Sequence, residues 1–486
     1  MKISKNLEDS VSAIKLKIKS DDVEFLNFNV KDNKAVLIFL KDTTDKNALG
    51  ELVIKPLDSL PSGYQEKDLE NAFLYPEKKK ITTIHQAVDE IVDGNAVLLV
   101  DDLGLGFAFG LKKFPMRAIT EPPTSAVIKG PREGFVESLP INISLMRRRI
   151  KSPDLKFINL IVGRYSKTPV SVCYIKGIAD KSLVKKVIKK LQTIDTDAIL
   201  DSSYISKFLG EHKASIFKQI GNTEKPDILS AKILEGRVAI MVDGSPIVLT
   251  VPYLLIEDFQ SPSDYYNSSY SATLARHLRL VSVIFSVLLP AYYVSAELFH
   301  LQLIPLSFLL TIVNSLKGIP LSPSFEMFFT LLIFEILNEA SVRMPKYVGM
   351  VVSIVGGLVL GETAVTAGII SAPTLMIIAL SGICLYTVPE LEQTFSILRF
   401  LMLIVAGSFG GYGLIVTIAL LFIYLVSFET FKTPLLCPFA PLVKRDLKDG
   451  FYKGFLIEQE FRPKSIKNEN ARRMNAKKSF EGESDV

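Results

Sequence analysis

Acidic side chains interrupt one of the apolar stretches of the sequence. "FEMFFTLLIFEILNEASVRMP", residues 325–345, contains Glu335 and Glu339 four residues apart, and Arg343 follows after another four. On a helix these three side chains share one face. Carboxylates in a membrane helix are costly unless they face protein or water. Together with Glu362 in the next apolar stretch, they are therefore candidate pore or gating residues.

Three interpretations of this acidic face remain open. Glu339 and Arg343 can form a structural pair near a membrane surface, or the face can contact another subunit. Alternatively, oligomerisation can gather the carboxylates around a cation path, as acidic rings do in cation channels. Glu335 has no cation four residues further on, so a structural role predicts little effect of Glu335→Gln. A path-lining role predicts altered cation release.

A second polar segment, "EPPTSAVIKGPREGFVES", occupies residues 121–138. Prolines stiffen a connection by fixing φ, and glycines permit turns. Arginine and glutamate side chains in the segment can form ion pairs across the joint, and the basic run at 147–149 favours a contact surface over a simple linker. We predict that the following residues form a hinge or subunit contact: Pro122, Pro123, Gly130, Arg132, Glu133 and Gly134.

The first half of the chain reads as two α/β subdomains, residues 1–118 and 139–278, joined by the hinge at 119–138. Runs rich in β-branched and aromatic residues predict strand pairs at 23–40 and 155–177, and a hairpin that turns at Asp243-Gly244. "DKSLVKKVIKKLQTI" predicts an amphipathic helix capped by Asp180 or Ser182. We expect a mixed sheet in the second subdomain. The glycines of "GLGFAFG" (104–110) alternate with apolar residues, which favours a strand over a phosphate-binding loop.

Residues 279–430 are predicted to form an α-helical, polytopic membrane domain, followed by a polar C-terminal tail at 431–486. Residues 280–299 have the length of one span, with a kink expected at Pro290. Residues 303–316 are too short to span and are expected to be interfacial or re-entrant. The 32 residues from 397 to 428 would reach about 48 Å as one straight helix. Two short or tilted helices around the glycines at 407–413 fit better, and four to six crossings are expected.

Composition excludes several classes of protein. A net charge of +5 over 486 residues gives no reason to expect nucleic-acid binding. The isolated cysteines and scattered histidines lack metal-ligand spacing, and no nucleophile–base arrangement is recognisable, so we expect no metal, no cofactor and no enzymatic activity. We expect no signal peptide, because the first 25 residues have no apolar core. Basic residues flank both ends of the apolar block, which predicts that the N-terminal region and the tail are cytoplasmic and that the number of crossings is even.

Several stretches together resemble the A subunits of GerA-family spore germination receptors. The resemblance implies a multi-pass protein of the spore inner membrane that oligomerises, contributes an ion-conducting path, and senses nutrients with a transporter-like B subunit and a lipoprotein C subunit. Nutrient recognition is more readily placed on the B subunit. A secondary transporter of small solutes or ions is the alternative, although no inverted repeat is visible. The matching stretches are PPTSAVIKGPREGFVES, LMRRRIKSPDL, YIKGIADKSLVKKV, GRVAIMVDGSP, DFQSPSDYY, RHLRL, FEILNEASVRMP, VSIVGGLVLGETAVTAGIIS and KTPLLCPFAP.

Overall fold

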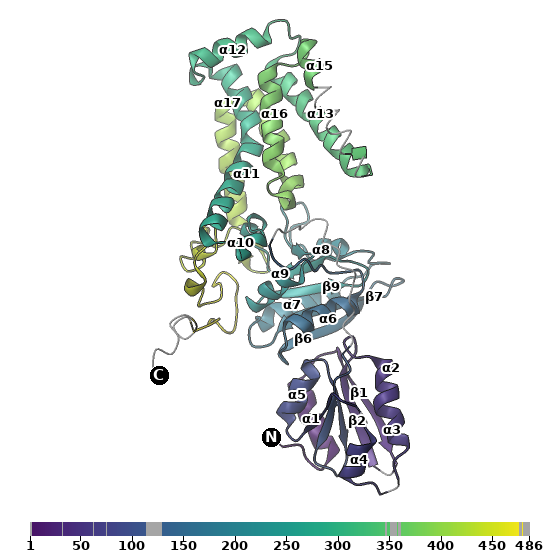
Figure 1. Ribbon diagram of the computed structural model, residues 1–486. Coiled ribbons are helices and arrows are strands. Elements are labelled where there is room, and N and C mark those ends of the chain that lie inside the picture. Colours follow the sequence, from purple (N-terminus) through teal and green to yellow (C-terminus); the bar gives the residue numbers. More distant parts are fainter. Residues whose placement is uncertain are drawn as a thin grey trace.

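The computed structural model places two sheet-containing parts in series below a group of long helices (Figure 1). Its C-terminal residues return from the helices to the level of the second sheet. The structure describes residues 2–31, 33–61, 63–73, 75–112, 129–345, 348–349, 357, 361–475 and 479.

The first sheet has helices on both faces. Its strand order is β1-β2-β4-β5-β3, and every described pairing is antiparallel. One apolar core joins α1 and α5 to one face, and a second core joins α2, α3 and α4 to the other. The strands are β1 (Val23–Val30), β2 (Asn33–Leu40), β3 (Lys78–Ile81), β4 (Ala96–Val100) and β5 (Gly106–Phe109). The helices are α1 (Leu7–Lys17), α2 (Lys46–Leu49), η1 (Gly50–Ile54), α3 (Lys55–Asp58), α4 (Glu66–Ala72) and α5 (Ile84–Val92).

The second sheet repeats this three-layer plan with the order β6-β7-β9-β10-β8. Helices α7 and α8 cover one face and α6 and α9 the other. The strands are β6 (Leu155–Val162), β7 (Thr168–Ile175), β8 (Gly221–Thr223), β9 (Val238–Val242) and β10 (Val248–Val251), and the helices are α6 (Leu139–Arg149), α7 (Lys181–Gln192), α8 (Ser202–Leu209) and α9 (Pro226–Leu234).

The expectation of a mixed second sheet is wrong for the described strands, because all of their pairings are antiparallel. Short turns join β6 to β7 and β9 to β10, which forces each of those pairs to be antiparallel. The helical connection that follows β7 then brings β9 in beside it in the opposite direction.

Local signals in the two sheet domains are confirmed. Asp180 caps α7 by accepting a hydrogen bond from Ser182 N at 3.0 Å. Gly244, in the turn between β9 and β10, has a φ of 86°, a conformation that favours glycine. Residues 106–109 form strand β5, as the alternation of glycine and apolar residues predicted.

Two helices of the described chain are long and apolar enough to cross a membrane: Ser269–Phe299, which is α11, and Pro389–Ser427, which contains α17. Pro290 lies inside α11. α17 (Glu392–Ser427) consists of two helices that join at Gly410 (φ 62°, ψ −150°). Thr394 near its start and Tyr424 near its end both contact residues 215–216, so the two helices run in opposite directions. The expectation of two short helices around 407–413 is thus confirmed. The other helices here are α12 (Leu306–Leu316), α13 (Pro323–Arg343), α15 (Gly361–Thr366) and α16 (Ala372–Leu385).

The count of four to six crossings stays a prediction, since most of residues 346–360 lie outside the described part.

The segment after α17 folds back onto the second sheet domain. It begins with a short hairpin, β11 (Glu429–Thr430) and β12 (Thr433–Pro434). Asn468 forms a β-bridge with Ala179, and Arg462 Nε donates to the carbonyl of Leu234 at 2.7 Å. The described part of the tail is therefore packed against the second sheet domain.

Short elements link these units. They are η2 (Leu255–Phe259), α10 (Ser263–Tyr266), η3 (Leu301–Leu303), η5 (Pro389–Leu391), η6 (Asp446–Lys448) and η7 (Leu456–Glu458).

Candidate functional site

The acidic face of α13 divides into two different environments. Glu339 and Arg343 form an exposed pair, with Arg343 Nε donating to Glu339 Oε1 at 2.7 Å. Glu335 instead faces α17, where it pairs with Arg399 and accepts from Ser396 Oγ at 3.0 Å. Glu335 has no cationic side chain four residues further along α13, but it has one on α17. Its partner comes from 64 residues further along the chain.

Arg399 is the residue that sequence reasoning missed. Its side chain is only 1% exposed, and its Nη1 donates to Ser381 Oγ of α16 at 3.0 Å. The signal for it was a lone cation in a long apolar run, because such a group must find a partner inside the protein.

A polar seam continues from this pair between α13, α16 and the start of α17. Asn338 Nδ2 donates to Glu392 at 2.8 Å, and Tyr386 Oη donates to Asn338 Oδ1 at 2.8 Å. Glu362 does not join the seam through any described contact. It is exposed at the start of α15, where its carbonyl accepts from Thr366.

The hinge is described only from residue 129 onward, so the predictions for Pro122 and Pro123 fall outside the described residues. Gly130 has a φ of 117°, and a Cβ there would lie 2.6 Å from the ring of Tyr266. Arg132 and Gly134 belong to the irregular segment that follows. Glu133 pairs with two arginines of α6 in the second sheet domain, Arg148 and, at 2.8 Å, Arg149.

A buried ion pair joins the two sheet domains. Arg147 of α6 donates through Nε to Asp22 Oδ2 at 2.7 Å and through Nη2 to Asp22 Oδ1 at 2.9 Å. Both side chains are at most 2% exposed. This two-point contact holds the domains in one relative orientation, since both bonds must break for the joint to rotate.

A second ionic joint connects the soluble part to α11. Asp264 of α10 accepts from Arg276 Nε at 3.1 Å and from Arg279 Nη1 at 2.8 Å. Arg276 is fully buried and also donates to Asp449 Oδ1 at 3.0 Å and to the carbonyl of Gly450 at 2.6 Å. The base of the first apolar helix is thereby tied to α10 and to the tail.

The second sheet domain also reaches the chain just before α17. Lys218 Nζ lies 2.8 Å from Glu390 Oε2 in the connection between α16 and α17, and 3.3 Å from Asp258 Oδ1. Burial opposes the charged form of Lys218, but the two carboxylates outweigh it and raise its pKa. The soluble part therefore contacts both long apolar helices, or their immediate flanks, through charged side chains.

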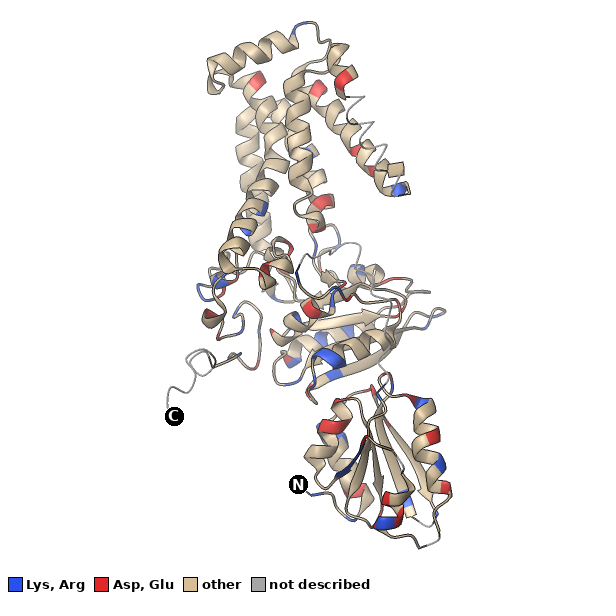
Figure 2. Ribbon diagram, in the orientation of Figure 1, with Lys and Arg blue, Asp and Glu red and all other residues tan. Residues whose placement is uncertain are grey.

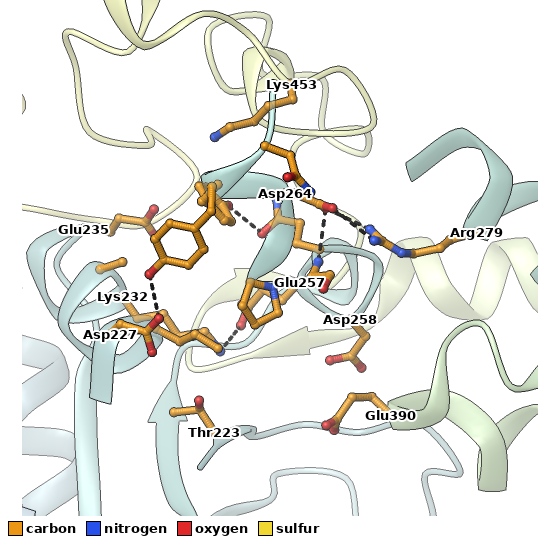
Figure 3. Close-up of a pocket in the computed structure, with 18 of the residues that line it drawn as sticks. Thr223, Asp227, Lys232, Glu235, Glu257, Asp258, Asp264, Arg279, Glu390 and Lys453 are labelled. Atoms are coloured by element: carbon orange, nitrogen blue, oxygen red, sulfur yellow. Dashed lines mark hydrogen bonds and ion pairs between the residues drawn. The ribbon is translucent and has the colours of Figure 1, made fainter. Parts of the chain in front are cut away.

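Between these contacts lies a cavity of about 820 Å³ (Figure 3). Its lining comes from the second sheet domain, from the α10 linker, from the connection before α17 and from the tail, and it carries charges of both signs. Burial alone would raise the pKa of Glu257, but Arg237 and Lys232 lower it to about 2. The labelled lining residues are Thr223, Asp227, Lys232, Glu235, Glu257, Asp258, Asp264, Arg279, Glu390 and Lys453.

Sequence comparison decides the family. A family model described as "GerA: Bacillus/Clostridium GerA spore germination protein" matches residues 12–465. The chain belongs to the GerA family.

Curated relatives of this GerA-family chain agree with the match. It is 34% identical over 478 residues to "Spore germination protein KA" of Bacillus subtilis, covering 96% of this chain and 88% of that protein. It is 30% identical to "Spore germination protein A1" of the same organism, covering 96% of each. These relatives are named as germination proteins and not as enzymes, in agreement with the expectation of no enzymatic activity.

Another relative is named as a membrane protein. It is 33% identical over 461 residues, covers 93% of this chain and 90% of its own length, and is named "Uncharacterized membrane protein YfkQ" of Bacillus subtilis. Among solved structures, the chain is similar to the N-terminal domain of the A subunit of the Bacillus megaterium spore germinant receptor GerK3, at 25% identity and a TM-score of 0.40, covering 52% of this chain and 98% of that one. Family membership and the two apolar helices together indicate a membrane protein.

Proposed function

We propose that this chain is the A subunit of a nutrient-sensing germinant receptor in the spore inner membrane. It works with a transporter-like B subunit and a lipoprotein C subunit, forms homo-oligomers, and contributes a signal-transducing element or an ion-conducting path. The names of its relatives as spore germination proteins support this role. The proposed units are residues 1–118, the hinge 119–138, residues 139–278, the membrane domain 279–430 and the tail 431–486.

The observation that carries the proposal is the ionic coupling between the soluble and helical parts. Asp264 holds the base of α11 through Arg276 and Arg279, and Lys218 reaches Glu390 just before α17. A displacement of the soluble part therefore acts on both long apolar helices. This is the arrangement that a receptor subunit needs if events outside the bilayer are to alter helices inside it.

The contacts of the tail support one topology. The tail packs on the second sheet domain, which is itself joined to the first, and these contacts support a location of all three on one side of the membrane. α11 begins and α17 ends near these domains (Figure 1), which supports an even number of crossings. Basic residues flanking the apolar block favour the cytoplasm, which in a spore is the core.

Two experiments test the proposed function. Spores deleted for this chain, challenged with a panel of amino acids, sugars and nucleosides, should lose the response to at least one nutrient and recover it on complementation. Liposomes containing the chain with its B and C subunits should release a trapped cation on addition of that nutrient. Unchanged germination with every nutrient in the panel would exclude the receptor role.

The alternative function is a secondary transporter, and the break in α17 at Gly410 favours it, because transporters bind substrates at broken helices. The liposome assay separates the two functions. Accumulation of the nutrient inside the vesicles would support transport, whereas ion release without accumulation supports the receptor.

A further inference from the structure

Two carboxylates from different helices meet inside the helical bundle, away from the Glu335–Arg399 pair. Glu297 lies two residues before the end of α11, and Glu326 lies in the first turn of α13. Glu326 is fully buried and Glu297 is 8% exposed. The two carboxylates lie close enough for the negative charge of Glu326 to repel a negative charge on Glu297. Figure 2 shows acidic segments in this upper part of the bundle.

Most of the oxygen atoms of this pair are buried without a hydrogen-bond partner. Glu326 Oε1 accepts from Ser371 N and from Ser371 Oγ, both at 2.7 Å. Glu326 Oε2 and both carboxylate oxygens of Glu297 have no hydrogen-bond donor in ideal geometry. A buried polar atom without a partner costs about 1–3 kcal/mol, and more if it is charged.

A neutral side chain independently points to a ligand at the same place. Tyr293, one helical turn before Glu297, is 6% exposed, and its hydroxyl also lacks a well-aligned partner. That hydroxyl lies toward Glu297 and toward Thr374 of α16. Tyr293 belongs to an apolar cluster with Met327, Ile378 and Leu403. Three carboxylate oxygens and one phenol oxygen without a hydrogen-bond partner thus lie in the same apolar part of the bundle.

Such a set of atoms needs a positive charge when both carboxylates are ionised. Neither carboxylate makes an ion pair with any described residue, and the groups that act on Glu297 are Glu326 and Tyr293. Two carboxylates cannot both stay ionised in an apolar interior without compensation. Carboxylate and hydroxyl oxygens are hard ligands, and they suit alkali and alkaline-earth cations better than soft metals.

We propose that Glu297, Glu326 and Tyr293 form a binding site for a hard metal cation between α11, α13 and α16. The site lies within one subunit. Occupancy ties the end of α11 to the starts of α13 and α16, the latter through Ser371, which caps α16.

The test uses the purified full-length protein in detergent micelles at pH 8. Thermal unfolding is measured in N-methylglucamine chloride and then with NaCl, KCl, MgCl₂ or CaCl₂ at matched ionic strength. At least one metal cation is expected to raise the unfolding temperature. A concentration 100 times the dissociation constant shifts the folding equilibrium about 100-fold. Radioactive counterparts of the effective ion should bind once per chain.

Variants locate the effect. Glu297→Gln and Glu326→Gln should each abolish the cation-dependent increment and the bound radioactivity, and radioactivity is read on folded protein only. Glu339→Gln is the matched control, because it removes an exposed carboxylate from α13 and should keep the whole increment. If one of the first two variants fails to fold, the other carries the test.

Three results would overturn the proposal. They are an increment equal for all salts including N-methylglucamine, an increment retained in both Glu297→Gln and Glu326→Gln, and stabilisation by acidification with no cation effect at pH 8. The last result would mean that the two carboxylates share a proton. None of these measurements depends on germination, so their outcome is separate from that of the proposed function.

Discussion

At the residue scale, buried arginines paired with carboxylates are the most consequential side chains of this protein. Among the described residues, Arg147, Arg276 and Arg399 are the largest fully buried side chains, and each binds a carboxylate from a distant segment or neighbouring element. A buried pair adds little net stability over an apolar pair, but the loss of one partner leaves an uncompensated charge and is strongly destabilising.

The pair between Glu335 and Arg399 gives the first prediction. Glu335→Gln should lower the free energy of unfolding by about 3–5 kcal/mol, because it leaves Arg399 buried without its counter-charge. Glu335→Gln combined with Arg399→Gln should recover most of the loss. Glu339→Gln, at the exposed pair, should cost about 0–1 kcal/mol. The measurement is the unfolding temperature in micelles and the amount of protein in spore membranes.

The pair between Glu335 and Arg399 changes how the result of Glu335→Gln must be interpreted. A structural role now predicts a large effect of Glu335→Gln, so loss of ion release alone no longer identifies a path-lining residue. Full protein level and stability combined with altered cation release would favour a path-lining Glu335 instead.

The second prediction concerns Glu257 and pH. Its folded-state pKa of about 2 lies below the ordinary value of 4.5. Between these values the unfolded chain binds the proton more readily than the folded one, so its contribution is complete above pH 4.5 and is lost as the pH falls toward 2. At about 1.4 kcal/mol per unit, a few kcal/mol are at stake. Unfolding temperatures from pH 6 to pH 2 should fall less steeply in Glu257→Gln than in the parent, and equal slopes would contradict the assignment.

At the element scale, the break in α17 decides how the two long helices meet. Gly410 has dihedral angles that only glycine adopts readily, and a Cβ there would lie 2.8 Å from the ring of Phe299, at the end of α11. The backbone turn at residue 410 and the close approach of α11 therefore both require glycine at this position.

Gly410→Ala is accordingly predicted to destabilise the packing of α11 on α17. Backbone strain alone costs about 1–3 kcal/mol, and the contact with Phe299 adds to it. Gly361→Ala is the control, because Gly361 does not have a positive φ and a Cβ there would meet only the flexible Leu375 side chain, at 3.2 Å. Thermal unfolding of both variants in micelles checks the difference. An unaffected Gly410→Ala protein would show that alanine is tolerated at the turn between the two helices of α17.

At the scale of the whole molecule, the junction determines whether the soluble and helical parts move together. Asp264 is 2% exposed and forms ion pairs with both Arg276 and Arg279. Asp264→Asn keeps the shape of the side chain but removes the charge that both arginines share.

This change is predicted to uncouple the two parts. Hydrogen exchange over residues 255–280 should rise by at least tenfold, and germination should weaken in spores that still contain the protein. Asp195→Asn breaks an exposed pair with Arg164 and should leave both unchanged. Normal exchange and normal germination in Asp264→Asn spores would show that the junction does not transmit the signal.

The sequence by itself determined the features that depend on neighbours along the chain. Runs rich in β-branched and aromatic residues marked the strand pairs at β1–β2 and β6–β7, and a short polar side chain before an amphipathic run marked the cap of α7. The apolar runs marked α11 and α17, and the motifs marked the family. These features are predictable because periodicity, capping and turn chemistry act within a few residues.

Only the tertiary structure decided which charges meet. Glu335 shares a helix face with Glu339 and Arg343, yet its partner is Arg399 from α17, and Asp22 finds Arg147 in another domain. The direction of β9 beside β7 likewise came from the return of a long helical connection. The physical reason is common to all three. Helical spacing limits the face on which a side chain lies, whereas its partner depends on how distant elements pack, and that packing follows from the burial of apolar surface over the whole fold.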